Sequence, residues 1–312
     1  MSARTIRRAA IDIGTVTTRL LVADTDGTSV CEVLRLTEVT QLGRGLHATG
    51  CLSEDGIARV AATVGSFVRE AARLGAQETV AVATSAARDA ANGSDLLESL
   101  EKVGVRPRII SGDIEARLSF TGATYGIDAA DMLVADLGGG STELVVGSAG
   151  SRDGGRFVEI AAAESVDVGS RRVLDKFLAS DPPTPAELEA ARSWAREQMQ
   201  PFFSRLRTCP HSLVTLAGTG TTLSAISQRL VPYDAARVHG SRLSAGEIAR
   251  LRAELAAMPV EARRAVAGMD PARADVIVAG AVILEAIMDL SGITETTVSE
   301  HDILYGLVLL GA

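Results

Sequence analysis

Short apolar runs and helical periodicities follow one another along the chain and predict alternating strands and helices. The stretches 9–24 and 133–146 each hold two apolar runs separated by a turn rich in Gly, Ser and Thr, which is typical of a β-hairpin. Further strands are predicted at 29–40, 79–84, 108–110, 157–161, 213–217 and 296–299. Helices are predicted at 56–74, 95–103, 111–124, 186–203, 244–258, 272–290 and 302–310, with another from Leu223. This alternation indicates an α/β fold.

The two predicted hairpins repeat each other without a gap. Asp12–Thr18 and Asp136–Thr142 each begin with the Asp that ends an apolar strand and continue through a Gly-led turn with Ser and Thr hydroxyls. Such a turn exposes backbone N–H groups beside a carboxylate, so it can hold a phosphate while the Asp orients a divalent metal or its waters. The repeat predicts a duplicated domain with two phosphate loops facing one cleft.

Turn chemistry alone also favours Gly at a hairpin tip, so one such motif would be weak. Three consecutive glycines at 138–140 are harder to explain as a turn, because they remove side chains where a ligand could approach the backbone. A third Gly/Thr turn is predicted at 217–222, between a strand and a helix. A helix N-terminus there would favour an anion, although Thr and Gly are also ordinary N-cap residues.

Composition narrows the class of protein. The 312 residues are enough for two domains, and a hydrophobic content of 46% with 22% charged residues is typical of globular chains. Aromatic residues make up only 3%, which disfavours a single-stranded nucleic-acid binder. The net charge of -8 argues against a global basic surface but leaves room for a local polyanion site.

Cysteine usage and hydropathy bear on the compartment. The three cysteines are scattered, which fits a reducing environment, and the four histidines lack metal-site spacing. Neither a secretory signal nor a membrane-spanning stretch is recognisable in the sequence. We expect a cytoplasmic protein with no membrane and no nucleic-acid partner. The polar stretch Gly126–Asp131 predicts a hinge between domains at 1–128 and 129–312, with 302–312 as a candidate to pack on the first domain.

Seven motifs occur in the order of a known family and span almost the whole chain. They are Ala10–Thr15, Ala83–Asn92, Ile110–Ala123, Asp136–Glu143, Val168–Val173, Leu216–Thr222 and Ser299–Leu307. On these motifs the chain resembles the exopolyphosphatase and guanosine pentaphosphate phosphohydrolase (Ppx/GppA) family, within the sugar kinase, heat-shock ATPase and actin superfold. The resemblance implies two duplicated ribonuclease H-like domains flanking a cleft.

Two features depart from the family pattern. The first loop of the family usually reads Ser-Asn-Ser after its Gly, whereas this chain has Thr15-Val16-Thr17 and so lacks the Asn amide. Many relatives continue into a C-terminal helical domain of the HD type, whereas this sequence ends at Ala312 and resembles the short two-domain form. We therefore expect the first tip to be a supporting clamp and the Asp136–Glu143 tip to be the metal and reaction side.

The resemblance implies an exopolyphosphatase that releases orthophosphate from the end of inorganic polyphosphate, with Mg²⁺, or alternatively Mn²⁺, as cofactor. Glu115 resembles the catalytic general base, although an acidic residue in a first helical turn also complements the helix dipole. Glu143 is expected to be catalytic and a metal ligand with Asp136 and Asp12. Phosphate contacts are expected from Gly14, Thr15, Thr17, Arg88, Gly138, Gly139, Gly140, Ser141, Thr142, Gly218, Thr219 and Gly220, with Arg171 and Arg172 as weaker candidates.

Three other functions stay open at this point. Guanosine pentaphosphate presents the same terminal anhydride, and (p)ppGpp or nucleotides could also act as ligands or inhibitors. A kinase of the superfold would transfer phosphate from ATP to an acceptor. A non-catalytic polyphosphate or alarmone sensor would bind without turnover. A homodimer is a further expectation, because the apolar segment 302–310 could pack on the first domain or form a dimer contact.

Overall fold

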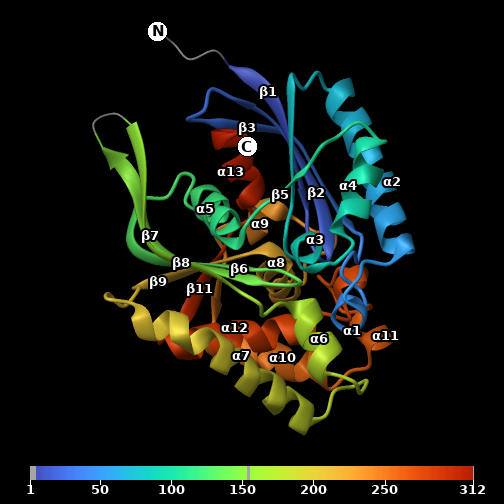
Figure 1. Cartoon of the computed structure of the whole chain (residues 1–312). Coiled ribbons are helices and arrows are strands. Elements are labelled where there is room, and N and C mark those ends of the chain that lie inside the picture. Colours follow the sequence, from blue (N-terminus) through green and yellow to red (C-terminus); the bar gives the residue numbers. More distant parts are fainter. Residues whose placement is uncertain (1–4, 153–154, 312) are drawn as a thin grey trace. The chain divides into compact units, whose positions relative to one another are not determined.

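The computed structural model describes residues 5–152 and 155–311. These residues form two compact units (Figure 1). The first contains the described residues up to Tyr125 together with those from Asp302 onward, and the second is Gly126–His301. The division falls three residues before the predicted boundary at 128/129, at the start of the predicted hinge, and the segment from Asp302 lies with the first unit.

The first unit is built on a five-stranded sheet with the order β3-β2-β1-β4-β5. β1, β2 and β3 are consecutive antiparallel strands, and β4 and β5 add in parallel beside β1. All five strands were predicted within a few residues. Their bounds are β1 (Ile6–Ile13), β2 (Thr17–Thr25), β3 (Val30–Val39), β4 (Glu78–Ala83) and β5 (Arg108–Ile109).

Helices cover both faces of this sheet because alternate strand residues are buried on opposite sides. Ile11 and Leu20 belong to the core with α2 and α4, whereas Ala10 and Leu21 belong to the core with α5 and α13. Figure 1 shows α13 against the β1–β3 strands. The helices of this unit are α1 (Leu46–Thr49), α2 (Glu54–Arg73), α3 (Ser85–Asp89), α4 (Gly93–Glu101), α5 (Gly112–Ala123) and α13 (Ile303–Leu310).

Two glycines allow α5 and α13 to approach each other closely. A Cβ on Gly122 would lie 1.8 Å from the Asp302 carbonyl oxygen, and a Cβ on Gly306 would lie 2.2 Å from that of Leu118. Neither position tolerates a side chain without separating the helices. Tyr125 and Tyr305 continue the contact, with ring centroids 5.4 Å apart.

The second unit repeats the first. Its sheet has the order β10-β11-β9-β6-β7-β8, so β8-β7-β6-β9-β11 reproduces β3-β2-β1-β4-β5, with the short β10 added at one edge. The predicted duplicated α/β architecture is therefore confirmed. The strands are β6 (Ala129–Leu137), β7 (Thr142–Arg152), β8 (Gly155–Val166), β9 (Ser212–Leu216), β10 (Arg242–Ser244) and β11 (Glu295–Val298).

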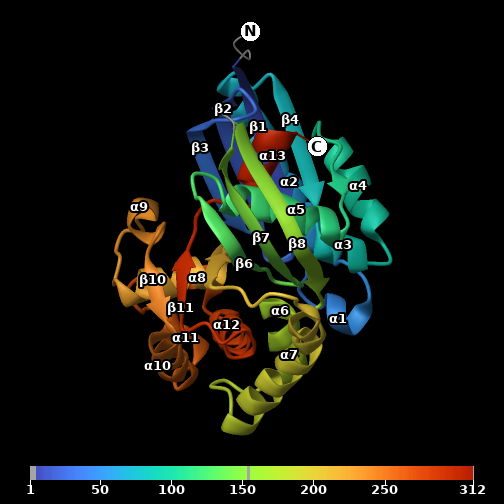
Figure 2. The ribbon, with the colours of Figure 1, turned by 90° about the vertical axis from the view of Figure 1, so that its left-hand side faces the viewer.

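The helices of the second unit surround α12, which is buried along Ile277–Met288 and packs on α6, α7, α8 and α10 (Figure 2). Its residues are apolar on almost all sides, apart from Glu285, which explains the length of the predicted helix there. The helical elements are α6 (Ser170–Phe177), α7 (Pro185–Arg205), α8 (Ala217–Ser227), α9 (Ala235–Val238), α10 (Ala245–Ala256), α11 (Val260–Arg263), the 3-10 turn η1 (Pro271–Arg273) and α12 (Ile277–Ser291).

Several predictions for the second unit were wrong in detail. β8 is much longer than 157–161, and β7 continues to Arg152, into the turn predicted at 150–155, of which 153–154 lie outside the described residues. α8 begins at Ala217 rather than Leu223, and α6 was not predicted at all. Within residues 5–152 and 155–311, no helix combines the length and apolarity needed to cross a bilayer.

Candidate functional site

The two hairpin tips have the same turn. The Gly14 amide donates to the Thr17 carbonyl at 2.9 Å, and the Gly138 amide donates to the Ser141 carbonyl at 3.0 Å. A Cβ on either glycine would lie 3.0 Å from that carbonyl oxygen, which is closer than a side chain normally comes. The leading Gly of each tip is therefore explained by the turn itself.

The first tip is held by the loop that follows β3. The Val16 carbonyl accepts hydrogen bonds from the amides of Thr40 and Gln41, each at 2.9 Å, and the Thr15 carbonyl accepts one from Gly43. Thr15 and Val16 are buried, and Thr17 begins β2 half-buried. Since Val16 packs inside the tip, this turn offers backbone amides to a ligand and no amide side chain at the position where the family has Asn.

The second tip is held by the N-terminus of α6. The Ser170 amide donates to the Gly138 carbonyl at 3.0 Å, the Arg171 amide to the Gly139 carbonyl at 2.8 Å, and Arg172 Nε to the Gly140 carbonyl at 2.9 Å. Because peptide N–H and C=O groups point in opposite directions, carbonyls bound to α6 turn the loop amides away from it. The triple-glycine loop is thus fixed in a form suited to an anion.

Gly169 makes this support possible. A Cβ on Gly169 would lie 2.4 Å from the Gly139 carbonyl carbon.

Of the two arginines considered as phosphate ligands, Arg171 binds Asp175 and Asp275. Arg172 supports the loop from behind, so the contacts of both arginines are structural.

Two carboxylates stand beside the second tip. Asp136 on β6 is the direct register partner of Glu143 on β7, and both are buried. Glu143 Oε1 accepts hydrogen bonds from Ser141 Oγ at 2.8 Å and from Ser165 Oγ at 2.7 Å. Thr142 is buried and donates to the Val168 carbonyl, a structural contact. Ser165 was not among the predicted site residues, because it lies outside the seven motifs and its neighbours in sequence give no sign that it faces Glu143 from the next strand.

Asp12 has a different partner at the equivalent position. Its Oδ2 accepts hydrogen bonds from Arg19 Nε at 3.0 Å and Nη2 at 2.6 Å, while its buried Oδ1 has no hydrogen-bond partner. Arg19 also bonds to Asp302. Burial raises the pKa of Asp12, an effect that Arg19 opposes. Asp12 is thus already paired with a cation inside its own unit.

Glu115 and Arg88 are brought together in the first unit. Ser111 caps α5 by accepting a hydrogen bond from the Ile114 amide, which places Glu115 in the first helical turn. Glu115 is 8% exposed, and its Oε2 lies 3.1 Å from Arg88 Nη1. Arg88 also donates to the Ile110 carbonyl at 2.9 Å. The predicted base, which is buried, and a predicted phosphate ligand, which is half-buried, therefore form one ion pair.

The predicted third loop is helical. Gly218, Thr219 and Gly220 form the first turn of α8, where their residue types are explained by packing. A Cβ on Gly218 would lie 1.4 Å from Arg273 Nη1, and one on Gly220 would lie 2.9 Å from Thr215 Cγ2. Thr219 is buried. A phosphate contact from this segment would have to come from the backbone amides of the helix N-terminus.

The donor set around Glu143 suits Mg²⁺. This small, hard cation takes oxygen ligands, keeps several waters and is commonly bound through one or two carboxylates and substrate phosphates. The adjacent carboxylates of Asp136 and Glu143 fit that pattern. In the described part of the chain there is no group of three or more His, Cys, Asp or Glu side chains placed to hold a metal, so a complete protein cage is absent there.

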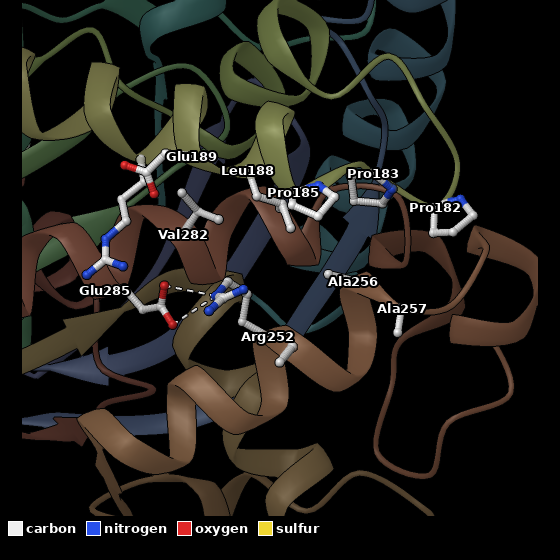
Figure 3. Close-up of a pocket in the computed structure, with 12 residues that line it drawn as sticks. Pro182, Pro183, Pro185, Leu188, Glu189, Arg252, Ala256, Ala257, Val282 and Glu285 are labelled. Atoms are coloured by element: carbon white, nitrogen blue, oxygen red, sulfur yellow. Dashed lines mark hydrogen bonds and ion pairs between the residues drawn. The ribbon is translucent and has the colours of Figure 1, made fainter.

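A cavity in the second unit lies among α7, α10 and α12 (Figure 3). Its volume is about 480 Å³, and its apolar wall includes Pro183, Leu188 and Val282. Arg252 Nε donates to both carboxylate oxygens of Glu285 at 2.9 Å. None of the predicted site residues lines this cavity.

Comparison with known proteins finds similarity along almost the whole chain. A model of the Ppx/GppA phosphatase family matches residues 21–310. Exopolyphosphatase 2 of Mycobacterium tuberculosis is 39% identical in an alignment that covers 97% of this chain and 98% of the relative. The crystal structure of an exopolyphosphatase-like protein has a TM-score of 0.90 at 32% identity, covering 98% of this chain and 97% of the other. An exopolyphosphatase from Cytophaga hutchinsonii has a TM-score of 0.86 at 27% identity and covers 98% of each chain.

Proposed function

Because the chain belongs to the Ppx/GppA phosphatase family, we propose that it is an exopolyphosphatase, which hydrolyses the terminal phosphoanhydride of inorganic polyphosphate and releases orthophosphate. The observation that carries the proposal is the second hairpin tip. Its glycine carbonyls are bound from behind by α6, and two buried carboxylates lie beside it. This combination suits a phosphate chain that arrives with a divalent cation.

The second tip offers the amides of 139–142 to phosphate oxygens, and the first tip offers those of 15–17 in the same way, while the amides of Gly14 and Gly138 close the turns. Asp136 and Glu143 would hold Mg²⁺, or Mn²⁺, directly or through waters, and the cation would supply positive charge to neutralise the phosphate oxygens. Catalysis of phosphoryl transfer depends mainly on such positioning and charge neutralisation.

Glu115 acts as the general base toward the attacking water. Its carboxylate is nearly buried, and Arg88 fixes one of its oxygens. Arg88 presents a planar guanidinium that can bind a carboxylate and a phosphate oxygen at the same time. The pair thus brings a base and a phosphate ligand to one place in the first unit.

The decisive experiment replaces Glu115 by Gln, which keeps the shape of the side chain and removes its basicity. We expect phosphate release from polyphosphate to fall by about 100-fold or more, the usual contribution of a general base. Binding of polyphosphate and the melting temperature should change little. Near-normal turnover in this variant would remove Glu115 from the mechanism.

Asp113→Asn is the matched control, because Asp113 lies in the same helical turn and is exposed. It should retain full activity. Release of orthophosphate is measured with malachite green on polyphosphate and on guanosine pentaphosphate in parallel. If only guanosine pentaphosphate were hydrolysed, the substrate would be the nucleotide and not polyphosphate. If neither were hydrolysed, the protein would be a binding protein and not an enzyme.

A cytoplasmic location is part of the same proposal. All three cysteines lie in the described part of the chain, where they are unpaired and exposed. Exposed thiols persist in a reducing compartment. Fractionation of cells that express a tagged chain would test the location.

A further inference from the structure

Three polar side chains form a row across the sheet of the second unit. Asp136 on β6 is the register partner of Glu143 on β7, and Glu143 is in turn the register partner of Ser165 on β8. Directly opposite residues on neighbouring strands project from the same face of a sheet. Ser165 is thus the side chain that flanks Glu143 on the side away from Asp136.

Two hydroxyls fix the orientation of the Glu143 carboxylate. Ser165 Oγ donates to Oε1 from the neighbouring strand at 2.7 Å, and Ser141 Oγ donates to the same oxygen from the phosphate loop at 2.8 Å. Glutamate has three side-chain torsions, so donors from two separate segments restrict it far more than one would. Hydrogen bonds to an ionised carboxylate are also stronger than those between neutral groups.

The equivalent row of residues in the first unit has only one carboxylate and serves as a comparison. The equivalent positions are Asp12, Arg19 and Thr37. Arg19 binds Asp12 directly, and Thr37 is exposed. At this third position of the row, a hydroxyl anchors a carboxylate in the second repeat and not in the first, and only the second repeat has two neighbouring carboxylates to hold together before a cation arrives.

We propose that Ser165 is a positioning residue that, together with Ser141, holds Glu143 in the orientation in which it and Asp136 bind the divalent cation. This inference rests on the metal site of the proposed function. Groups that orient a metal-binding side chain typically change metal affinity or activity by about 10–100-fold when they are removed. Loss of the Ser165 hydroxyl should therefore lower the affinity for the metal more than it lowers the stability of the fold.

The test compares Ser165→Ala with Ser165→Thr, which keeps the hydroxyl, and with Thr37→Ala as the matched control from the first repeat. Mn²⁺ binding to the full chain is measured by calorimetry and electron paramagnetic resonance with no substrate present. The Mg²⁺ concentration for half-maximal phosphate release is measured separately. We expect about 10-fold weaker Mn²⁺ binding and a similar rise in the Mg²⁺ requirement for Ser165→Ala. Ser165→Thr should stay within about 3-fold of the wild type, and Thr37→Ala should be unchanged.

Three results would overturn the inference. The first is an unchanged Mn²⁺ affinity in Ser165→Ala with only a lower melting temperature, as a merely structural serine would give. The second is an equal loss of Mn²⁺ affinity in Ser165→Thr, because removal of the hydroxyl would then not explain the loss. The third is a wild-type chain that binds no Mn²⁺. By contrast, a wild type that binds Mn²⁺ but releases no phosphate from polyphosphate would contradict the proposed function and leave the role of Ser165 standing.

Discussion

Arg88 reaches Glu115 through the same Nη1 group that donates to the Ile110 carbonyl, with distances of 3.1 Å and 2.9 Å. The backbone contact anchors the guanidinium just before the N-terminus of α5, the helix that carries Glu115. A phosphate that binds Arg88 is therefore held next to the proposed base. The pair links substrate binding to the orientation of the group that activates water.

Replacement of Arg88 should affect both roles. Arg88→Lys keeps the charge but loses the planar fork, so we expect kcat/KM for polyphosphate to fall by about 10–100-fold, mainly through KM. Arg88→Gln removes the charge as well and should also lower kcat. Steady-state phosphate release measures both variants. Arg108 on β5 is exposed, and Arg108→Gln should behave as the wild type. Unchanged kinetics in Arg88→Gln would mean that Arg88 has only a structural role.

Gly169→Ala should displace the phosphate loop. The backbone at Gly169 has φ -136 and ψ 159, which alanine adopts easily, so the effect comes from the collision with Gly139. We expect kcat/KM for polyphosphate to fall by about 10-fold or more. Overpacking of this kind costs about 1–3 kcal/mol of stability, measured by chemical unfolding.

Gly246→Ala provides the control for Gly169→Ala. Gly246 lies in α10, and a Cβ there meets nothing within 4 Å. Its replacement should leave activity unchanged and stabilise the helix by about 0.5–1 kcal/mol. If Gly169→Ala retained full activity, the contact between α6 and the loop would not control phosphate binding.

Glu187 should make the stability of α7 depend on pH. Its carboxylate closes a capping box with Thr184 and accepts hydrogen bonds from the amides of Ala179 and Ser180. Backbone hydrogen bonding from Thr184 is the largest cause that lowers the pKa of Glu187 from 4.5 to about 2. A carboxyl whose pKa is lower in the folded state stabilises the fold above the unfolded value and loses that contribution as pH falls.

The corresponding variant is Glu187→Gln. We expect its melting temperature to be about 2–4 degrees below that of the wild type at neutral pH. The difference should shrink between pH 4.5 and about 2, where the carboxylate of the wild type becomes protonated. Thermal unfolding followed by circular dichroism measures it. Glu189→Gln, in the same helix but outside the capping box, serves as control, and a pH-independent difference would contradict the capping role.

The duplicated sheets could be predicted because their hairpins carry a local signal. Apolar strands, a Gly-led tip and the order of the motifs are all visible in neighbouring residues. The start of α8 could not be predicted in this way, since Gly and Thr favour turns over helix interiors. Tertiary packing overrides that preference, because Arg273 lies against Gly218 and Gly220 packs closely on Thr215.

For the candidate site too, neighbouring residues in the sequence predicted part of the arrangement, and tertiary contacts determine the rest. Asp136, Glu143 and the triple glycine could be named from their motif, and the cap at Ser111 predicted the place of Glu115. The partners that fix them come from other segments. Ser165 reaches Glu143 from β8, and α6 binds the loop from more than 25 residues away along the chain. Arg19 could have been recognised, because the gapless repeat sets it at the position of Glu143.

The placement of α13 affects how the protein can be made on the ribosome. Ile303 and Leu307 help to bury the sheet face that contains Ala10 and Leu21, although they follow those strands by nearly 300 residues. At about 5–20 residues per second, the intervening second unit takes roughly ten to thirty seconds to synthesise. During that time this face of the nascent first sheet can be covered by α5 but not by α13. The first unit to be started is thus the last to be completed, and its newly made strands need protection from aggregation until α13 emerges.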